Sequence, residues 1–466
     1  MRGLTSTVVL VIVLAGLGAY IYFVDSKRPA ATAGGDSEPR GKVFTVEADK
    51  INELRITYQG QSSLLRKTEA GWAMVEPTKV DADPPEAIGV TTALSNIDIV
   101  RVVDENATNF EQFGLANPNI TVAFKAEGGA AGTLKLGNKN ATQGEIYALK
   151  DDAKRVFLVS AFQESSFNRT PFQLRDKKIL KFDRDKADAL TLVKGATSME
   201  LARTGSDWKV VKPVASRSDF SAVEGFITRL SSANMSKLVE ENATDLAKYG
   251  LDKPTMTVTI GAGSAKTVLE IGKTENDDRY ARDASRPIVF TVDSTLATDL
   301  EKNFDDYRKK ELFEFRPFSL AKLRAVLDAP GGPKTYEFEK QKPAQPADPE
   351  TWKVTRVGGS SHTADQTVID DLLNKLTAIK ADSFVEAKTN TGLAKPALVV
   401  SASFEEGKFE RVRFGQVGEN AYGVRDGEEG IAKIDQSSMK AAMQAFDVAV
   451  TPKEPAQAPK TDEAKK

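Results

Sequence analysis

The sequence contains no cysteine and only one histidine, His362. The absence of cysteine excludes disulfides, thiol nucleophiles, thiolate metal sites and a lipid-modified N-terminal cysteine. His362 follows Gly358, Gly359, Ser360 and Ser361 just before an expected helix, so we interpret it as an exposed loop residue rather than a catalytic base. A Ser-His-Asp triad would also need a nucleophile elbow, and the sequence has no such motif.

A strong net charge is also missing. Lys and Arg total 64, Asp and Glu total 66, and the formal net charge is −2. Nucleic-acid binding is therefore disfavoured, because it depends on an excess of positive charge that releases counterions from phosphates. The chain is 40% hydrophobic and 28% charged, which is ordinary for folded domains, and 466 residues at about 150 per domain suggest three of them.

One long hydrophobic run is present at the N-terminus. Leu4 to Val24 carry no charge, and at about 1.5 Å per residue such a helix spans roughly the 30 Å hydrocarbon core of a bilayer. The run ends in Tyr20, Ile21, Tyr22 and Phe23, which suit a membrane interface. We predict a transmembrane anchor. The alternative is a signal peptide cleaved near residues 30–33, although such apolar regions are usually shorter.

The flanks of the run set the expected topology. Positive charges flank the run on both sides, so counting them does not decide the orientation: Arg2 and the amino terminus lie on one side, and Lys27, Arg28, Arg40 and Lys42 on the other. A short polar head before a hydrophobic segment is the usual signal-anchor layout, and we expect a single-pass protein of the bacterial inner membrane with its body in the periplasm. Residues 25–41 are rich in Pro, Gly, Ser and Ala, which is typical of a flexible linker, and residues 451–466 predict a disordered tail.

Self-comparison reveals a threefold repeat. Three kinds of landmark recur at similar spacing: Trp72, Trp208 and Trp352; Gly-Leu-x-x-Pro beginning at Gly114, Gly250 and Gly392; and Tyr147, Tyr280 and Tyr422. Because unrelated landmarks share one period, the repeat reflects duplicated folding units.

Each repeat predicts the same series of elements. Short strands lead to the Trp strand, an Asp that can cap a helix follows (Asp83, Asp219 and Asp365), and the helix has apolar residues three and four apart. Asn-Ala-Thr at residues 106–108 and 242–244 is interpreted as the polar start of a short helix rather than a glycosylation site. Gly-Leu-x-x-Pro then ends that helical turn, and alternating strands follow, closing at residues 156–159, 288–292 and 431–434.

The predicted fold is therefore α+β. Three tandem homologous modules, each a mixed or antiparallel sheet with one long helix and short helices, follow the N-terminal transmembrane helix. The expected boundaries are 1–42 for the anchor and linker, 43–181, 182–314 and 315–450 for the modules, and 451–466 for the tail.

These motifs resemble a bacterial family of unknown function, the one numbered 4340. The likeness rests on the anchor, the Trp strand, Gly-Leu-x-x-Pro, the strand ends at Gly137, Gly272 and Gly415, and the closing segments at residues 175–182 and 308–315. The resemblance implies an anchored, repeated envelope protein, often associated with ABC transporter components of the gliding-motility type. It brings no catalytic residues with it. The third repeat departs from the pattern by its short approach to Gly392 and an insertion at residues 341–350.

Other candidate motifs have simpler structural interpretations. Residues 261–267, Gly-Ala-Gly-Ser-Ala-Lys-Thr, resemble a phosphate loop but lie between two strands, which predicts a hairpin turn. Three acidic pairs could in principle bind calcium or act in glycoside hydrolysis: Asp81 with Asp83, Asp277 with Asp278, and Asp370 with Asp371. None has the spacing of a calcium-binding loop, and among 66 acidic residues such pairs are expected by chance. The Trp residues have apolar neighbours and are expected in the cores. We therefore predict no catalytic, cofactor-binding or metal-binding residues.

Two functional hypotheses follow. In the first, the chain is a non-catalytic scaffold or binding protein of the envelope that contacts another membrane protein, such as an ABC transporter component. In the second, it is an extracytoplasmic enzyme or ligand binder that acts on cell-wall or carbohydrate material. That alternative requires carboxylates and Tyr147, Tyr280 or Tyr422 to meet in a cleft between modules. The tether, the repeats and the missing catalytic residues favour the scaffold.

Overall fold

The computed structural model describes residues 41–276, 278–343, 345, 350–386, 388–405 and 407–452. The chain forms two compact units, and the boundary between them falls between Lys177 and Lys178. The predicted membrane anchor, residues 25–40 of its linker and residues 453–466 of the predicted tail lie outside the described residues. Within the described ranges, no helix combines the length and the apolar character needed to cross a bilayer.

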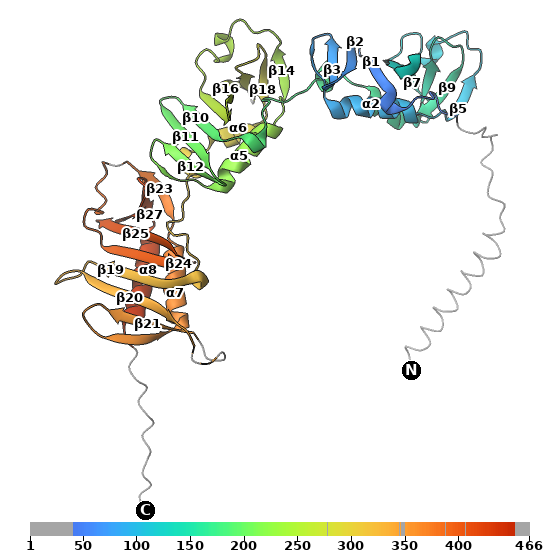
Figure 1. The fold of residues 1–466 in the computed structure, drawn as a ribbon. Coiled ribbons are helices and arrows are strands. Elements are labelled where there is room, and N and C mark those ends of the chain that lie inside the picture. Colours follow the sequence, from blue (N-terminus) through green and yellow to red (C-terminus); the bar gives the residue numbers. More distant parts are fainter. Residues whose placement is uncertain are drawn as a thin grey trace, which may run out of the picture. The chain divides into compact units, whose positions relative to one another are not determined.

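The three modules contain matching elements, drawn in Figure 1. In the first unit, module 1 consists of η2 (Ala48–Lys50), β1 (Ile51–Tyr58), β2 (Gln61–Thr68), β3 (Gly71–Glu76), β4 (Val80–Asp81), α2 (Pro84–Asn96), β5 (Arg101–Asp104), η3 (Glu111–Phe113), β6 (Ile120–Ala126), η4 (Glu127–Gly129), β7 (Ala131–Lys139), β8 (Glu145–Lys150), β9 (Val156–Ser160), η5 (Ala161–Gln163), α3 (Glu164–Phe167) and α4 (Pro171–Leu174).

The second unit holds the other two modules. Module 2 consists of η6 (Arg184–Lys186), β10 (Ala189–Lys194), β11 (Thr197–Thr204), β12 (Asp207–Lys212), β13 (Ser216–Arg217), α5 (Phe220–Ser232), β14 (Lys237–Glu240), η7 (Ala247–Tyr249), β15 (Met256–Ala262), β16 (Ala265–Glu275), β17 (Asp278–Asp283), β18 (Val289–Val292), α6 (Ser294–Glu301) and η8 (Phe304–Tyr307). Module 3 consists of η9 (Pro317–Ser319), β19 (Leu320–Leu327), β20 (Lys334–Gln341), β21 (Thr351–Arg356), β22 (Ser361–Asp365), α7 (Gln366–Thr377), β23 (Ala381–Val385), β24 (Leu398–Phe404), β25 (Lys408–Val417), β26 (Asn420–Arg425), β27 (Ile431–Ile434) and α8 (Gln436–Val450).

Each module forms one nine-stranded sheet, and the strand order is the same three times. In module 1 the order is β4-β3-β2-β1-β6-β7-β8-β9-β5, and modules 2 and 3 repeat it strand for strand. The strand pairs are antiparallel throughout the described sheets, so of the two predicted arrangements the antiparallel one is confirmed. The modules are mostly β, with few helices. The predicted meander did not include its outer edge strand (β5, β14 or β23), which follows the long helix and pairs beyond β9, β18 or β27.

The three tryptophans occupy equivalent places in the three cores. Trp72, Trp208 and Trp352 lie on β3, β12 and β21 and are 8%, 2% and 0% exposed. Two of the indole groups donate to a residue of the long helix: Trp208 Nε1 to Glu224 Oε1 at 2.7 Å and Trp352 Nε1 to Gln366 Oε1 at 2.9 Å. The predicted core role is confirmed, because each ring joins the sheet to the helix that covers it.

The long helix of each module begins at the predicted aspartate. Asp83 and Asp219 accept the backbone N–H groups of Glu86 and Ala222, while Asp365 occupies the same N-cap position without that bond. In α5 the apolar face of Val223, Phe226, Ile227 and Leu230 is buried, as its spacing predicts. Sequence reasoning missed α8, which packs against α7 on one face of the module 3 sheet (Figure 1) and follows the last strand there.

Gly-Leu-x-x-Pro packs against a glycine of a later strand, which lies inside β7, β16 or β25 and not at the strand end that the sequence predicted. Gly114, Gly250 and Gly392 have φ values of 71°, 68° and 70°, a left-handed conformation that glycine adopts without steric cost. The turn lies directly against the strand glycine: a Cβ atom on Gly137, Gly272 or Gly415 would lie 2.2 Å from the preceding turn's carbonyl oxygen. Two landmarks that are separate in the sequence are therefore one close backbone packing.

Candidate functional site

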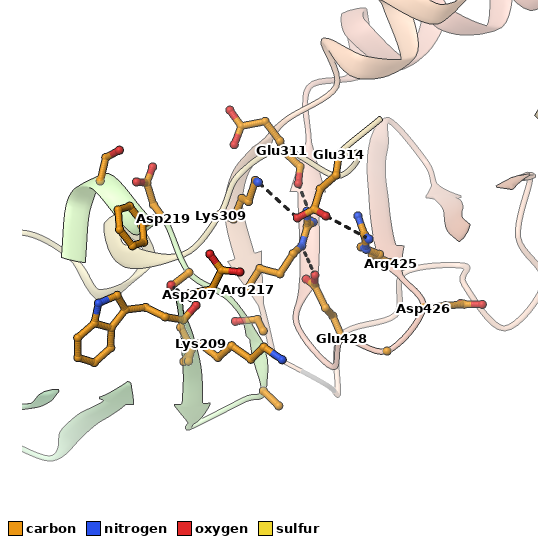
Figure 2. A pocket seen from close by; sticks show the side chains of 18 residues that line it. Asp207, Lys209, Arg217, Asp219, Lys309, Glu311, Glu314, Arg425, Asp426 and Glu428 are labelled. Atoms are coloured by element: carbon orange, nitrogen blue, oxygen red, sulfur yellow. Dashed lines mark hydrogen bonds and ion pairs between the residues drawn. The ribbon is translucent and has the colours of Figure 1, made fainter. Parts of the chain in front are cut away.

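A charged cavity of about 770 Å³ lies within the second unit, where module 2 is joined to module 3 (Figure 2). Three kinds of segment line it: β12, β13 and the first turn of α5 from module 2, the segment of residues 309–314 that connects the modules, and the hairpin between β26 and β27. We call this the junction cavity.

The connecting segment is hydrogen-bonded to the sheets on both of its sides. Ser218 and Arg308 form a β-bridge, and the Lys309 N–H donates to the Arg217 carbonyl at 3.1 Å. On the module 3 side, the Ala381 N–H donates to the Lys310 carbonyl at 2.8 Å. Because the backbone of one segment extends two sheets, the modules are joined without a flexible linker at this place.

The Arg217 side chain from module 2 binds both the connecting segment and module 3. Its guanidinium binds Glu314 at 3.0 Å and Glu428, and donates through Nη2 to the carbonyls of Glu311 at 2.8 Å and Leu312 at 3.4 Å. Figure 2 shows this side chain from module 2 pointing between the two carboxylates. A planar guanidinium has five donors in a fixed geometry, so a single residue can bind the connecting segment and module 3 together.

A second guanidinium supports the same segment from within module 3. Arg425 forms ion pairs with Glu410 and, at 3.6 Å, with Glu314. The Glu410 side chain is fully buried, and its oxygens accept the N–H groups of Glu314 at 3.0 Å and Phe315 at 2.9 Å. A buried carboxylate is stable only when its lone pairs are satisfied, and here one cation and two amides satisfy them.

The electrostatics of the cavity favour ionised carboxylates. Burial alone would raise the pKa of Glu314, but the hydrogen bond and charge of Arg217, together with Arg425 and Lys309, outweigh burial and lower that pKa. A hydrogen bond from Lys380 lowers the pKa of Glu311 in the same way. Both carboxylates are therefore charged at neutral pH, which suits ion pairing rather than proton donation.

Most acidic groups of the cavity already have partners. Five of the six lining carboxylates bind cations or backbone amides: Glu314 and Glu428 bind Arg217, Glu311 binds Lys380, Asp426 binds Arg411 and Arg413, and Asp219 caps α5. The sixth, Asp207, is exposed. Glycoside hydrolysis needs two carboxylates that face the substrate, whereas these five bind the protein's own cations or backbone amides.

The tyrosines required by the enzyme hypothesis do not line the junction cavity. Tyr147 packs on Phe113 with ring centroids 5.0 Å apart, and Tyr280 packs on Tyr249 at 5.1 Å. Tyr422 is 7% exposed. Tyr147 and Tyr280 pack beside the leucine of the Gly-Leu turn in their modules, and Tyr422 is buried, so the three tyrosines serve packing.

The other sequence candidates are also placed. The prediction that His362 lies in a loop is wrong. His362 belongs to β22, pairs with Val354 of β21 and is half-buried, with its Nε2 3.1 Å from the Ala449 carbonyl oxygen of α8. The segment Gly261–Thr267 is a hairpin turn between β15 and β16, as predicted.

Each acidic pair and Asn-Ala-Thr segment also has a place in the described parts of the chain. Asp81 ends β4, Asp83 caps α2, Asp278 begins β17 and Asp370 binds Gln366, while Asp277 lies outside the described residues. Among the residues that the structure describes, no group of three or more acidic or histidine side chains could hold a metal ion. The short helices predicted after Asn-Ala-Thr exist but begin later, at Glu111 and Ala247, whose backbone N–H groups donate to the side chains of Asn109 and Asp245.

Sequence reasoning did not identify the charged residues that build the junction, which are Arg217, Glu314, Glu410, Arg425 and Glu428. Arg217 and Glu428 are 211 positions apart, and neither belongs to a motif. One weak signal exists, because Arg217 corresponds to Asp81 in module 1 by its place two residues before the helix cap. A change of charge at one repeat position suggests a role particular to one joint.

Comparison with known families identifies the repeat. The model of the family described as Domain of unknown function (DUF4340) matches residues 72–215 and 208–396. The chain belongs to this family. The two DUF4340 matches begin at Trp72 and Trp208, which lie on the same strand of modules 1 and 2, and end at residues 215 and 396. No curated protein matches the chain.

Proposed function

We propose that this DUF4340 protein is a membrane-anchored, extracytoplasmic scaffold or binding protein of the bacterial envelope. Its partner would be another envelope protein, such as an ABC transporter component of the gliding-motility type. The observation that carries the proposal is the junction itself: the charged groups of its cavity bind the connecting segment and so hold module 2 to module 3. Groups used in this way support a fixed protein surface better than they support turnover.

The anchor rests on sequence alone. Leu4 to Val24 form a run without charge that is long enough for one membrane crossing. Protease added to intact spheroplasts is expected to digest the modules, since they lie outside the cytoplasm. Full protection of the modules, with digestion only after lysis, would reverse the proposed topology.

Crosslinking tests the scaffold directly. The chain has no cysteine, so a single introduced cysteine can carry a crosslinker at a known site. Phe318→Cys and Val448→Cys use exposed positions of module 3 (73% and 62% exposed), and Phe162→Cys, at 71% exposed, probes module 1. Mass spectrometry of membranes is expected to recover one reproducible envelope protein from at least one site. Recovery of only uncrosslinked monomer from all three sites would contradict the scaffold.

The size of the junction cavity favours a second candidate function, the binding of a small molecule. A volume of about 770 Å³ is within the range of small-molecule sites, and Asp207 and Lys209 are exposed at its wall. An extracytoplasmic enzyme or binder of cell-wall carbohydrate would use these groups. Release of sugars from purified cell wall by the wild-type protein, lost in Asp207→Asn and kept in Glu241→Gln outside the cavity, would favour this alternative over the scaffold.

A further inference from the structure

A second cavity lies in module 2, away from the junction cavity. Its volume is about 300 Å³, and three cationic side chains and one carboxylate line it: Lys194, Lys273, Arg279 and Glu301. They come from the end of β10, from β16 and β17, and from the last turn of α6. We call this the module 2 corner.

Two of the cations are partly enclosed. Lys194 is half-buried, donates to the Lys302 carbonyl at 2.5 Å and lies 5.7 Å from the centre of the Phe304 ring. Arg279 is 21% exposed and pairs with Glu301 at 2.5 Å. Burial lowers the pKa of Lys194 and the nearby Arg279 lowers it further, against the opposing charges of Glu301 and Asp306. Enclosing the Lys194 ammonium beside a second cation is therefore unfavourable, and Glu301 and Asp306 offset that cost only in part.

The other two modules show that the fold does not require these charges. Strand pairing identifies the residues equivalent to Lys194 as Tyr58 in module 1 and Leu327 in module 3. Each is the last residue of its strand, and the three pair with Met256, Ile120 and Leu398. Tyr58 and Leu327 pack on the cores of their modules. The same comparison applies to Arg279, which pairs with Val292 where Ile146 pairs with Val159 and Ala421 with Ile434.

Ile146 and Ala421 are 1% and 2% exposed. Module 2 therefore has cations at two positions where modules 1 and 3 bury or half-bury uncharged side chains, and a cavity lies beside them. Substituting charge for apolar packing costs stability unless the charge is used.

We propose that the module 2 corner binds a small phosphate-type dianion through Lys194, Arg279 and Lys273. Three cations and one carboxylate on the lining leave an excess of two positive charges, which matches a dianion better than a single carboxylate. Lys supplies a point charge for phosphate oxygens, and Arg279 keeps donors beyond those that it uses on Glu301. A volume near the lower end of the range for ligand sites suits a phosphate or a short phosphate monoester.

The repeats supply a variant that should keep the fold. Lys194→Leu, Arg279→Ala and Glu301→Met together place at the corner the residues that module 3 has at these positions, Leu327, Ala421 and Met443. The triple variant makes the net charge more negative by one unit. Lys266→Leu is the matched control, because it changes the net charge equally on the β15–β16 hairpin, outside the cavity lining.

The test is calorimetric titration of the full-length protein in detergent with inorganic phosphate. We expect saturable binding by the wild type and by Lys266→Leu, and at least tenfold weaker binding by the triple variant, with unchanged circular dichroism. Acetylation of Lys194 by a soluble reagent, followed by mass spectrometry, should slow when phosphate is present. No saturable binding by the wild type, or equal binding by the triple variant, would overturn the site.

Further ligands define what the site recognises. Acetate is expected to bind at least tenfold more weakly than phosphate, and acetate binding as tight as phosphate binding would overturn the assignment of a dianion. Tighter binding of glycerol 3-phosphate than of phosphate would support a monoester as the ligand, whereas weaker binding would support free phosphate. These results are independent of crosslinking to an envelope partner, so this site and the scaffold can fail separately.

Discussion

Removing the buried carboxylate of Glu410 should release the segment that connects modules 2 and 3. Glu410→Ala leaves the Arg425 guanidinium and the N–H groups of Glu314 and Phe315 without their acceptor. Removing one member of a buried ion pair typically costs about 3–5 kcal/mol, because the other charge remains buried. At about 1.4 kcal/mol per tenfold change in an equilibrium constant, we expect local opening to increase by between about 100-fold and 4,000-fold.

Hydrogen exchange followed by mass spectrometry measures this opening in the full chain. Peptides that contain Glu314 and Phe315 should lose protection by that factor, while the Trp72 strand of the first unit should not change. Glu410→Gln keeps an acceptor for the amides but not the charge, and should have an intermediate effect. Glu405→Ala is the matched control, because Glu405 pairs with Lys408 at the protein surface, where ion pairs contribute little.

Equal protection in Glu410→Ala and Glu405→Ala would refute the reasoning. It would mean that the connecting segment is held by its backbone bridges alone and that the carboxylate is incidental. Loss of protection throughout module 3 would have a different meaning: Glu410 would then support the whole fold of the module rather than its joint.

Three further predictions address the junction and the packing. Spin labels can be attached through Val211→Cys and Phe409→Cys, which are exposed positions of modules 2 and 3. Arg217→Ala should broaden the distribution of distances between the two labels, because it removes the ion pairs with Glu314 and Glu428. An unchanged distribution would argue against the bridging role of Arg217. Because the pKa of Glu314 is lowered from 4.5, its stabilisation is present above that pH and lost as pH falls through the lowered pKa, so the same distances should broaden in acid. Gly137→Ala should destabilise module 1 by about 1–3 kcal/mol through its 2.2 Å clash, whereas Gly89→Ala on open α2 should stabilise it by about 0.5–1 kcal/mol, measured by thermal unfolding.

The sequence predicted the parts of the fold that depend on local pattern. Trp72, Trp208 and Trp352 occupy one core position three times. An aspartate also occupies the N-cap position of each long helix, with the capping hydrogen bond in modules 1 and 2, so the repeat in the sequence reflects a repeat in the structure. Helix α8 could also have been found, because Asp435 caps it and Met439, Ala442 and Phe446 recur at helical spacing. The four-residue edge strand β5 is too short for its alternation to be recognised.

The candidate site could not be predicted in the same way. Arg217 binds Glu428 from 211 positions away, and any one of 64 cations could be assigned to any of 66 acids from sequence alone. The pairing depends on strand register and on the path of the connecting segment, which local patterns do not encode. The prediction for His362 was wrong for a related reason. The preceding glycines suggested a loop, but His362 pairs with Val354 and so belongs to the edge strand β22.

Differences between equivalent positions carry more information about function than the repeated residues do. The segment that enters each module from its N-terminal side, here called the lead-in segment, contacts the sheet at one shared position. In module 3 this position is Glu410, which accepts the backbone N–H groups of Glu314 and Phe315. In module 2 it is Thr267, whose hydroxyl lies 3.5 Å from the Lys181 carbonyl oxygen, and in module 1 it is Gly132, which leaves room for the Phe44 ring. Register places these three residues opposite Ala402, Ile260 and Phe124, so they share one position. All three contacts hold the lead-in segment, which is why the fold tolerates the change. The cations of the module 2 corner satisfy no such shared requirement, because uncharged packing suffices there in the other two modules, and a ligand is the simplest reason for module 2 to keep them.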